Sequence, residues 1–127
     1  MEGGRLNALG TQILLDLRQC DEALLDDVDV IQEAMVHAAD RAGATIVGQS
    51  FHKFDPRGVT GIVAIAESHL AIHTWPEHGY AAVDIFTCGA GFTPRKAAEL
   101  IIDRLGCPNP KITEFQRGLH QEKSAAV

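Results

Sequence analysis

The stretch HLAIHTWPEHGYAAVDIFTC, residues 69–88, carries the clearest structural signal in this 127-residue chain. Its two halves are typical of strands, and PEHG between them carries the proline and glycine of a turn. In the second half Ala81, Val83 and Ile85 alternate with Ala82, Asp84 and Phe86, which is the period of a strand with two different faces. The stretch therefore predicts an antiparallel hairpin with one buried face.

Four further runs indicate strands, and two segments have helical periodicity. The strand-like runs are 11–20, 44–54, 59–68 and 111–118. The first helix is expected from Asp26 to a stop at Gly43, and the second from Thr93-Pro94 to a stop at Gly106. The predicted fold is α/β (α+β), a two-layer sandwich with a mostly antiparallel sheet and two helices on one face. The uncovered sheet face predicts a dimer, and residues 1–8 and 119–127 are expected to lack regular structure.

Length, charge and cysteine usage narrow the class of protein. The length predicts a single domain, 1–127, and the net charge of −6 argues against a nucleic-acid binder. No segment has the apolar length of a membrane span, and the N-terminal residues do not resemble a secretion signal. The three cysteines form no CxxC pair, which favours a reducing, cytoplasmic location.

The hairpin stretch concentrates polar groups that suit several chemistries. His69 and His73 share one face of a strand, and Asp84 or Cys88 could complete a tetrahedral metal site. However, the segment contains no HExxH motif on a helix, and two locally packed histidines explain the spacing more simply. The pattern therefore favours no metal.

Two kinds of nucleophilic chemistry fit the same residues. Ser68 lies near histidines and an aspartate but lacks a G-x-S-x-G elbow, and Cys88 with a histidine could form a thiol pair. Alternatively, the Ser68 hydroxyl attacks the carbonyl of its own preceding peptide bond, and elimination and hydrolysis then leave a pyruvoyl group. Thr60, His73 and Cys88 could supply the support, base and proton donor that this route needs. Spacing alone does not choose among these routes.

The sequence resembles the prokaryotic S-adenosylmethionine decarboxylase proenzyme family, whose members depend on a pyruvoyl group. The matching segments are ALG at 8–10, GATIV at 43–47, FHKF at 51–54 and the long run GVTGIVAIAESHLAIHTWPEHGYAAVDIFTCG at 58–89. QRG at 116–118 stands where the family has a similar Arg-Gly. The resemblance covers about residues 8 to 118, and the central run is highly specific.

The resemblance implies self-cleavage between Glu67 and Ser68 into a β chain, 1–67, and an α chain, 68–127. Ser68 becomes the pyruvoyl group that forms a Schiff base with the substrate, and Glu67 supplies the cleavage-site carbonyl. Thr60 supports the ester intermediate, and His73 accepts the α-proton during processing. Cys88 matches the donor that reprotonates the substrate carbon after decarboxylation. No metal and no pyridoxal phosphate are implied.

The resemblance also implies a substrate site and an assembly. Phe54 aligns with the aromatic residue that stacks on adenine, and Glu77 with the carboxylate that binds the ribose hydroxyls. Family members of this short type are dimers of processed units, and their product supplies aminopropyl groups for spermidine synthesis. His52 and His69 are interpreted as supporting residues, and Cys20 and Cys107 as packing thiols.

Three positions depart from the family pattern and leave the substrate open. Gln12 stands where the opening motif has histidine, and Asp16 where it has glutamate. Asp55, directly after the stacking Phe54, suits a substrate cation, although it also suits the start of a turn before Pro56. The leading hypothesis is S-adenosylmethionine decarboxylase. The alternatives are an ornithine or arginine decarboxylase on the same scaffold, with Asp55 holding the distal cation, and an uncleaved homologue that only binds a partner.

Overall fold

A six-stranded, fully antiparallel sheet forms one layer of the molecule. The structure is a computed structural model that describes residues 6–88 and 91–121. The strand order across the sheet is β3-β4-β5-β6-β2-β7. The strands are β2 (Gly10–Leu17), β3 (Ile46–Lys53), β4 (Val59–Ile65), β5 (Ser68–Trp75), β6 (Tyr80–Thr87) and β7 (Lys111–Arg117).

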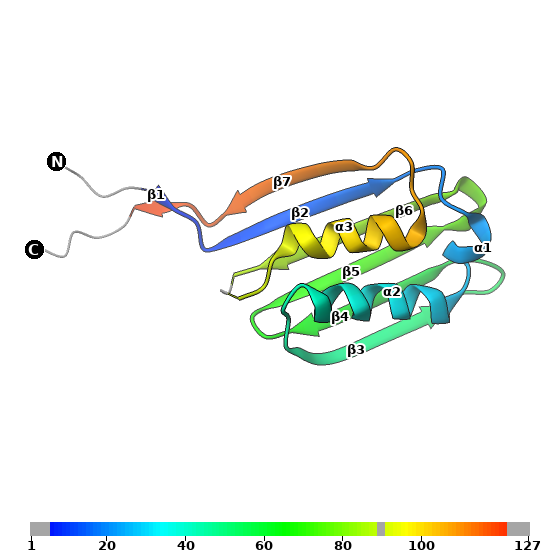
Figure 1. Cartoon of the computed structure of the whole chain (residues 1–127), viewed down its shortest axis with the longest axis horizontal. Helices are drawn as coiled ribbons and strands as arrows, with labels where there is room; N and C mark the ends of the chain where they lie inside the picture. The colour runs from blue at the N-terminus through cyan, green and yellow to red at the C-terminus, as the bar shows by residue number, and fades with distance from the viewer. Residues whose placement is uncertain (1–5, 89–90, 122–127) are drawn as a thin grey trace, which may run out of the picture.

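Two long helices form the second layer and lie on the same face of the sheet (Figure 1). They are α2 (Val28–Arg41) and α3 (Pro94–Leu105), so the predicted α+β sandwich is confirmed. Two short helices accompany them: α1 (Glu22–Leu25), which the sequence analysis did not predict, and the 3₁₀ turn η1 (Pro76–His78). No helix of the described residues covers the opposite face of the sheet (Figure 1).

Local signals in the sequence explain where the helices begin and end. Asp27 caps α2, since its carboxylate accepts hydrogen bonds from the backbone N–H groups of Asp29 and Val30 at 3.0 and 3.2 Å. The helix starts slightly later than the predicted Asp26, because that residue makes other contacts. Helix α3 follows Thr93 and ends at Gly106, which adopts φ 64°.

Alternating side chains place the core between the sheet and the helices. In β6 every second residue is buried, as the alternation at 81–86 predicts. Helices α2 and α3 face these positions with a mixture of alanine and larger apolar side chains. Buried residues of the two helices are Ile31, Ala34, Met35, Ala38, Ala39, Ala97, Ala98, Ile101 and Leu105.

Two short strands near the ends of the chain pair with each other, contrary to the expectation for segments 1–8 and 119–127. Strand β1 (Leu6–Asn7) pairs antiparallel with β8 (His120–Gln121). This short ribbon continues from the ends of β2 and β7 (Figure 1). Two backbone donations stabilise the junction, from the Leu9 N–H to the carbonyls of Arg117 and Gly118. The rest of both predicted segments, 1–5 and 122–127, lies outside the described residues.

Within the described ranges, no helix is long and apolar enough to cross a membrane.

Candidate active site

The predicted cleavage site lies in the tight turn between β4 and β5. Ile65 pairs with Ser68, so only Ala66 and Glu67 form the loop. Glu67 has φ 63°, in the left-handed region that favours glycine. A side chain in this conformation costs about 1–2 kcal/mol, so the residue before Ser68 carries backbone strain.

The carbonyl of Glu67 receives two side-chain donors. The Ser68 hydroxyl donates to it, and the Cys88 thiol donates to it with an Sγ–O distance of 2.7 Å. The Cys88 backbone N–H lies 3.3 Å from the Ser68 Oγ. Ser68 pairs with Thr87 across β5 and β6, and this register brings Cys88 to the turn. Three predicted site residues, Glu67, Ser68 and Cys88, therefore meet at one peptide bond.

Thr60 and His73 form a second cluster. They are cross-strand neighbours on β4 and β5, and the Thr60 Oγ1 lies 3.0 Å from the His73 Nδ1. A hydroxyl beside a ring nitrogen fixes the orientation of the imidazole, which suits a histidine that accepts a proton.

A cavity of about 270 Å³ opens beside this pair. It is lined by Phe54, Arg57, Gly58, Thr60, His73, Thr74, Trp75 and Glu77. Four predicted site residues therefore share one pocket: the adenine and ribose candidates Phe54 and Glu77, and the processing candidates Thr60 and His73. Asp55 does not line the cavity, whereas Arg57 does. The sequence analysis missed Arg57 as a site residue, because a DPRG turn carries no signal of which side chain faces a ligand.

The two clusters lie at opposite ends of β5. His73 is five residues from Ser68 along the strand, a separation of about 16 Å at roughly 3.3 Å per residue. The Thr60–His73 pair of one chain is therefore far from the Glu67–Ser68 bond of the same chain.

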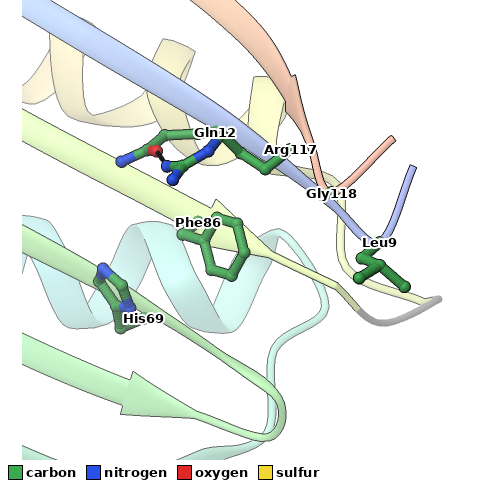
Figure 2. A pocket seen from close by; sticks show the side chains of 6 residues that line it. All are labelled: Leu9, Gln12, His69, Phe86, Arg117 and Gly118. Atoms are coloured by element: carbon green, nitrogen blue, oxygen red, sulfur yellow. Dashed lines mark hydrogen bonds between the residues drawn. The ribbon is translucent and has the colours of Figure 1, made fainter. Parts of the chain in front are cut away.

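A larger cavity, of about 430 Å³, is lined by several of the positions singled out in the sequence. Leu9, Gln12, His69, Phe86, Arg117 and Gly118 line it. Figure 2 shows the Arg117 guanidinium reaching the Gln12 side chain, whose carbonyl oxygen accepts its hydrogen bond. Gln12, the residue that departs from the family's histidine, is thus paired with the arginine of the late Arg-Gly motif.

The second departure also has a partner. The Tyr80 hydroxyl donates a hydrogen bond to the Asp16 carboxylate. This bond, together with partial burial and the negative charge of Asp16, raises the pKa of Tyr80. Asp16 therefore belongs to a side-chain pair on β2 and β6, away from the Glu67–Ser68 bond.

Two further histidines pack against aromatic rings, and the other two cysteines are buried. The His52 ring packs edge-on against Phe54 at 4.5 Å between centroids, and the His69 ring lies 6.0 Å from Phe86. Cys20 and Cys107 are buried, and burial raises the pKa of both thiols. No group of three or more metal-ligating side chains occurs in the described ranges 6–88 and 91–121.

Comparisons with known proteins identify one family. Residues 11–118 match the S-adenosylmethionine decarboxylase family. An S-adenosylmethionine decarboxylase proenzyme from Thermodesulfovibrio yellowstonii is 49% identical over 112 residues, which are 88% of this chain and 83% of the relative. A proenzyme of the same name from Caldanaerobacter subterraneus subsp. tengcongensis is 49% identical over 117 residues, 92% of this chain and 94% of the relative.

A solved structure extends the similarity to three dimensions. The crystal structure of adenosylmethionine decarboxylase from Aquifex aeolicus VF5 superimposes with a TM-score of 0.86 at 37% identity. The match covers 93% of this chain and 98% of that one. Sequence and fold agree over nearly the whole length, and the chain belongs to the S-adenosylmethionine decarboxylase family.

Proposed function

We propose that this chain is a single-domain proenzyme that cleaves itself between Glu67 and Ser68 and then decarboxylates S-adenosylmethionine. The observation that carries the proposal is the meeting of the Ser68 hydroxyl and the Cys88 thiol at the Glu67 carbonyl. The family membership and the proenzyme names of the relatives support it.

Cleavage begins with attack of the Ser68 Oγ on the Glu67 carbonyl carbon. The carbon–nitrogen bond breaks, an ester forms and the Ser68 amine is freed. The Cys88 thiol stands where it can donate to the oxygen that becomes negative in this step. The left-handed backbone at Glu67 favours departure from the planar peptide, because its strain is released when the bond breaks.

Elimination then separates the two chains. His73 is the proposed base that removes the α-proton of Ser68, and the electron pair expels the Glu67 carboxylate from the serine β-carbon. The dehydroalanine left on the new N-terminus takes up one water and releases one ammonia. The products are chains of 67 and 60 residues, the second beginning with a pyruvoyl group.

The pyruvoyl group supplies an electron-poor carbonyl that takes up the electron pair released when carbon dioxide leaves the substrate. Its surroundings fit this group, since the Ser68 hydroxyl accepts a hydrogen bond from the Cys88 backbone N–H, and the Cys88 thiol donates to the carbonyl directly before Ser68. Cys88 is the proposed donor that returns a proton to the substrate carbon. A thiol suits this role because it is a weak acid that can donate its proton to a carbanion.

The cavity beside Thr60 and His73 is the proposed adenosine site. The Phe54 ring offers a stacking surface, and the Glu77 carboxylate offers acceptors for ribose hydroxyls. Arg57 lines the same cavity and Asp55 does not. The Asp55 carboxylate is therefore not placed to hold the distal cation of ornithine or arginine. Phe54 and Glu77 offer contacts to an adenine ring and to ribose hydroxyls, which only S-adenosylmethionine has, so the pocket favours S-adenosylmethionine.

A homodimer is part of the proposal, because each chain separates the pocket from the bond to be cleaved. A second copy packed on the uncovered face of the sheet would bring its Thr60, His73 and pocket to the Ser68 of the first. That face carries Ile62 and Phe115, exposed at 44% and 46%, and Trp75 at its edge. Two-fold symmetry would then build two equivalent sites.

Denaturing mass spectrometry and carbon dioxide release test the proposal together. We expect two chains that correspond to 1–67 and 68–127, with the second blocked at its N-terminus by pyruvoyl. Carbon dioxide release should be seen with S-adenosylmethionine and not with ornithine or arginine at matched concentrations. A single uncleaved chain would overturn the enzyme proposal and favour a binding protein. Release from ornithine or arginine alone would overturn the substrate assignment.

A further inference from the structure

Asp26, between α1 and α2, contacts the loop that forms one wall of the proposed adenosine site. Its Oδ1 accepts a hydrogen bond from the Gly58 backbone N–H at 2.8 Å. The same oxygen lies 3.1 Å from the Lys53 Nζ. Asp26 lies 32 positions before Gly58 in the chain, so this is a tertiary contact rather than a local turn.

The two partners of Asp26 stand at the two ends of one loop. Lys53 precedes Phe54, and its Nζ donates to the Phe54 carbonyl at 2.8 Å. Gly58 closes the loop, since its carbonyl accepts the Phe54 N–H at 2.8 Å. One carboxylate therefore holds both ends of the segment that carries Phe54 and Arg57 into the cavity.

A buried hydroxyl supports the same contact from the sheet. The Thr74 Oγ1 donates to the Leu25 carbonyl and accepts the Val59 N–H, both at 2.8 Å. Leu25 and Val59 are the chain neighbours of Asp26 and Gly58, and Thr74 follows His73. Two adjacent hydrogen-bonded connections thus join the α1–α2 junction to the pocket wall.

We infer that Asp26 is a positioning residue of the proposed adenosine site, acting through Lys53 and Gly58 on the Phe54–Gly58 loop. It does not line the cavity. Its effect is to hold the Phe54 ring and the Arg57 guanidinium in place before a ligand arrives, which lowers the entropy lost on binding. This inference rests on the proposed function, because it assigns the loop to an adenosine site.

A binding measurement on the processed protein tests the inference. The probe is 5′-methylthioadenosine, which lacks the α-amino group and so cannot react with a pyruvoyl carbonyl. Trp75 is the only tryptophan of the chain and lines the cavity, so its fluorescence reports binding. The Asp26→Ala variant is expected to raise the dissociation constant by roughly three- to tenfold. Asp26→Asn, which keeps an oxygen acceptor for Gly58, should lie between it and the parent protein.

Asp27→Ala is the matched control. Asp27 is the neighbouring carboxylate and caps α2, so its removal lowers the melting temperature without touching the loop. Its dissociation constant should stay at the parent value. With S-adenosylmethionine, Asp26→Ala should raise KM more than it lowers kcat, since Asp26 acts at the pocket end of β5.

The outcomes separate this inference from the function on which it rests. Parent-like binding by Asp26→Ala would overturn the inference and leave the proposed function in place. Equal weakening by Asp26→Ala and Asp27→Ala would also overturn it, because the effect would then follow stability alone. If the parent protein itself shows no saturable binding, the adenosine site is wrong and the inference fails with it.

Discussion

The two ends of β5 differ in structure: one adjoins a tight turn and the other adjoins a cavity. Directly before β5 the chain turns at the strained Glu67, and the Ser68 hydroxyl and the Cys88 thiol both donate to the Glu67 carbonyl. At its far end a cavity of about 270 Å³ is lined by side chains, with the Thr60–His73 pair at its wall. In each chain the bond proposed to be cleaved and the proposed binding pocket are therefore kept apart. A second copy is the simplest way to unite them.

Co-expression of two inactive variants gives the largest expected effect, because it changes activity from none to substantial. Ser68→Ala alone should not cleave, and His73→Ala alone should cleave poorly and stay inactive. In a mixed dimer, the Ser68 of the His73→Ala chain meets the His73 of the Ser68→Ala chain. We expect cleavage of the His73→Ala chain and release of carbon dioxide, both measured on purified mixed dimers.

The control for this test is a chain that carries both substitutions, co-expressed with Ser68→Ala. That pair lacks any Ser68, so no activity should return. If the two single variants fail to complement although mixed dimers form, His73 does not act across an interface, and the shared site would be wrong.

Alternation and helix signals predicted most of the fold. The pattern at 81–86 predicted the buried face of β6, and Thr93-Pro94 with Gly106 predicted the bounds of α3 closely. The pairing of β1 with β8 was not predicted, because two-residue strands have no periodicity to detect. Helix α1 was missed for a similar reason, since four residues contain only one turn.

Replacing Cys88, at the β4–β5 turn, should affect substrate turnover without preventing chain cleavage. Cys88→Ala should still yield two chains, because the Ser68 hydroxyl and the strained Glu67 remain. Its kcat is expected to fall by about 100-fold or more, since a positioned general acid typically contributes that much. The measurements are mass spectrometry for cleavage and carbon dioxide release for kcat.

Cys20→Ala provides the matched thiol control. Cys20 is buried in the core, so its loss should lower stability while kcat stays near the parent value. Full turnover by Cys88→Ala would remove the assigned proton-donor role.

At the pocket end, Glu77→Gln should act on binding rather than on chemistry. Loss of a charge-assisted hydrogen bond to ribose is expected to raise KM by about tenfold with little change in kcat. Glu99→Gln, on the exposed side of α3, is the control and should leave KM unchanged. A fall in kcat with unchanged KM would place Glu77 outside the ribose site.

The site residues were foreseen only in part, and the reason is geometric. The resemblance named Ser68, Cys88, Thr60 and His73, but it could not show that they form two clusters. That result follows from register: Ser68 pairs with Thr87, whereas His73 pairs with Thr60 and Ala82. The sequence also could not show which residue of the 55–58 turn faces the cavity. Asp55 was therefore predicted as a site residue, whereas Arg57 is the one that lines the cavity.

Relief of the strain at Glu67 should have two smaller effects, one on the free energy of unfolding and one on the rate of cleavage. Glu67→Gly, measured in the uncleaved Ser68→Ala background, is expected to raise the free energy of unfolding by about 1 kcal/mol. With Ser68 present, the same substitution should slow cleavage by about fivefold, since less strain is released. Gln19, with φ 57°, offers the matched control, because Gln19→Gly should stabilise the chain without slowing cleavage. Faster cleavage by Glu67→Gly would contradict the role of strain.

The smallest effect is expected from the charge of Asp26, whose contribution to the stability of the pocket-wall loop should be lost in acid. The Gly58 N–H and then Lys53 hold the pKa of Asp26 below its ordinary value. A lowered folded-state pKa means that this carboxylate stabilises the protein above the unfolded-state pKa of about 3.9, and the contribution is lost as pH falls through the folded-state value. The difference in urea midpoint between the parent chain and Asp26→Asn, both with Ser68→Ala, should therefore stay constant from neutral pH to about pH 5 and shrink below about pH 4. A difference that persists unchanged into stronger acid would mean that the effect of the substitution does not come from the charge of Asp26.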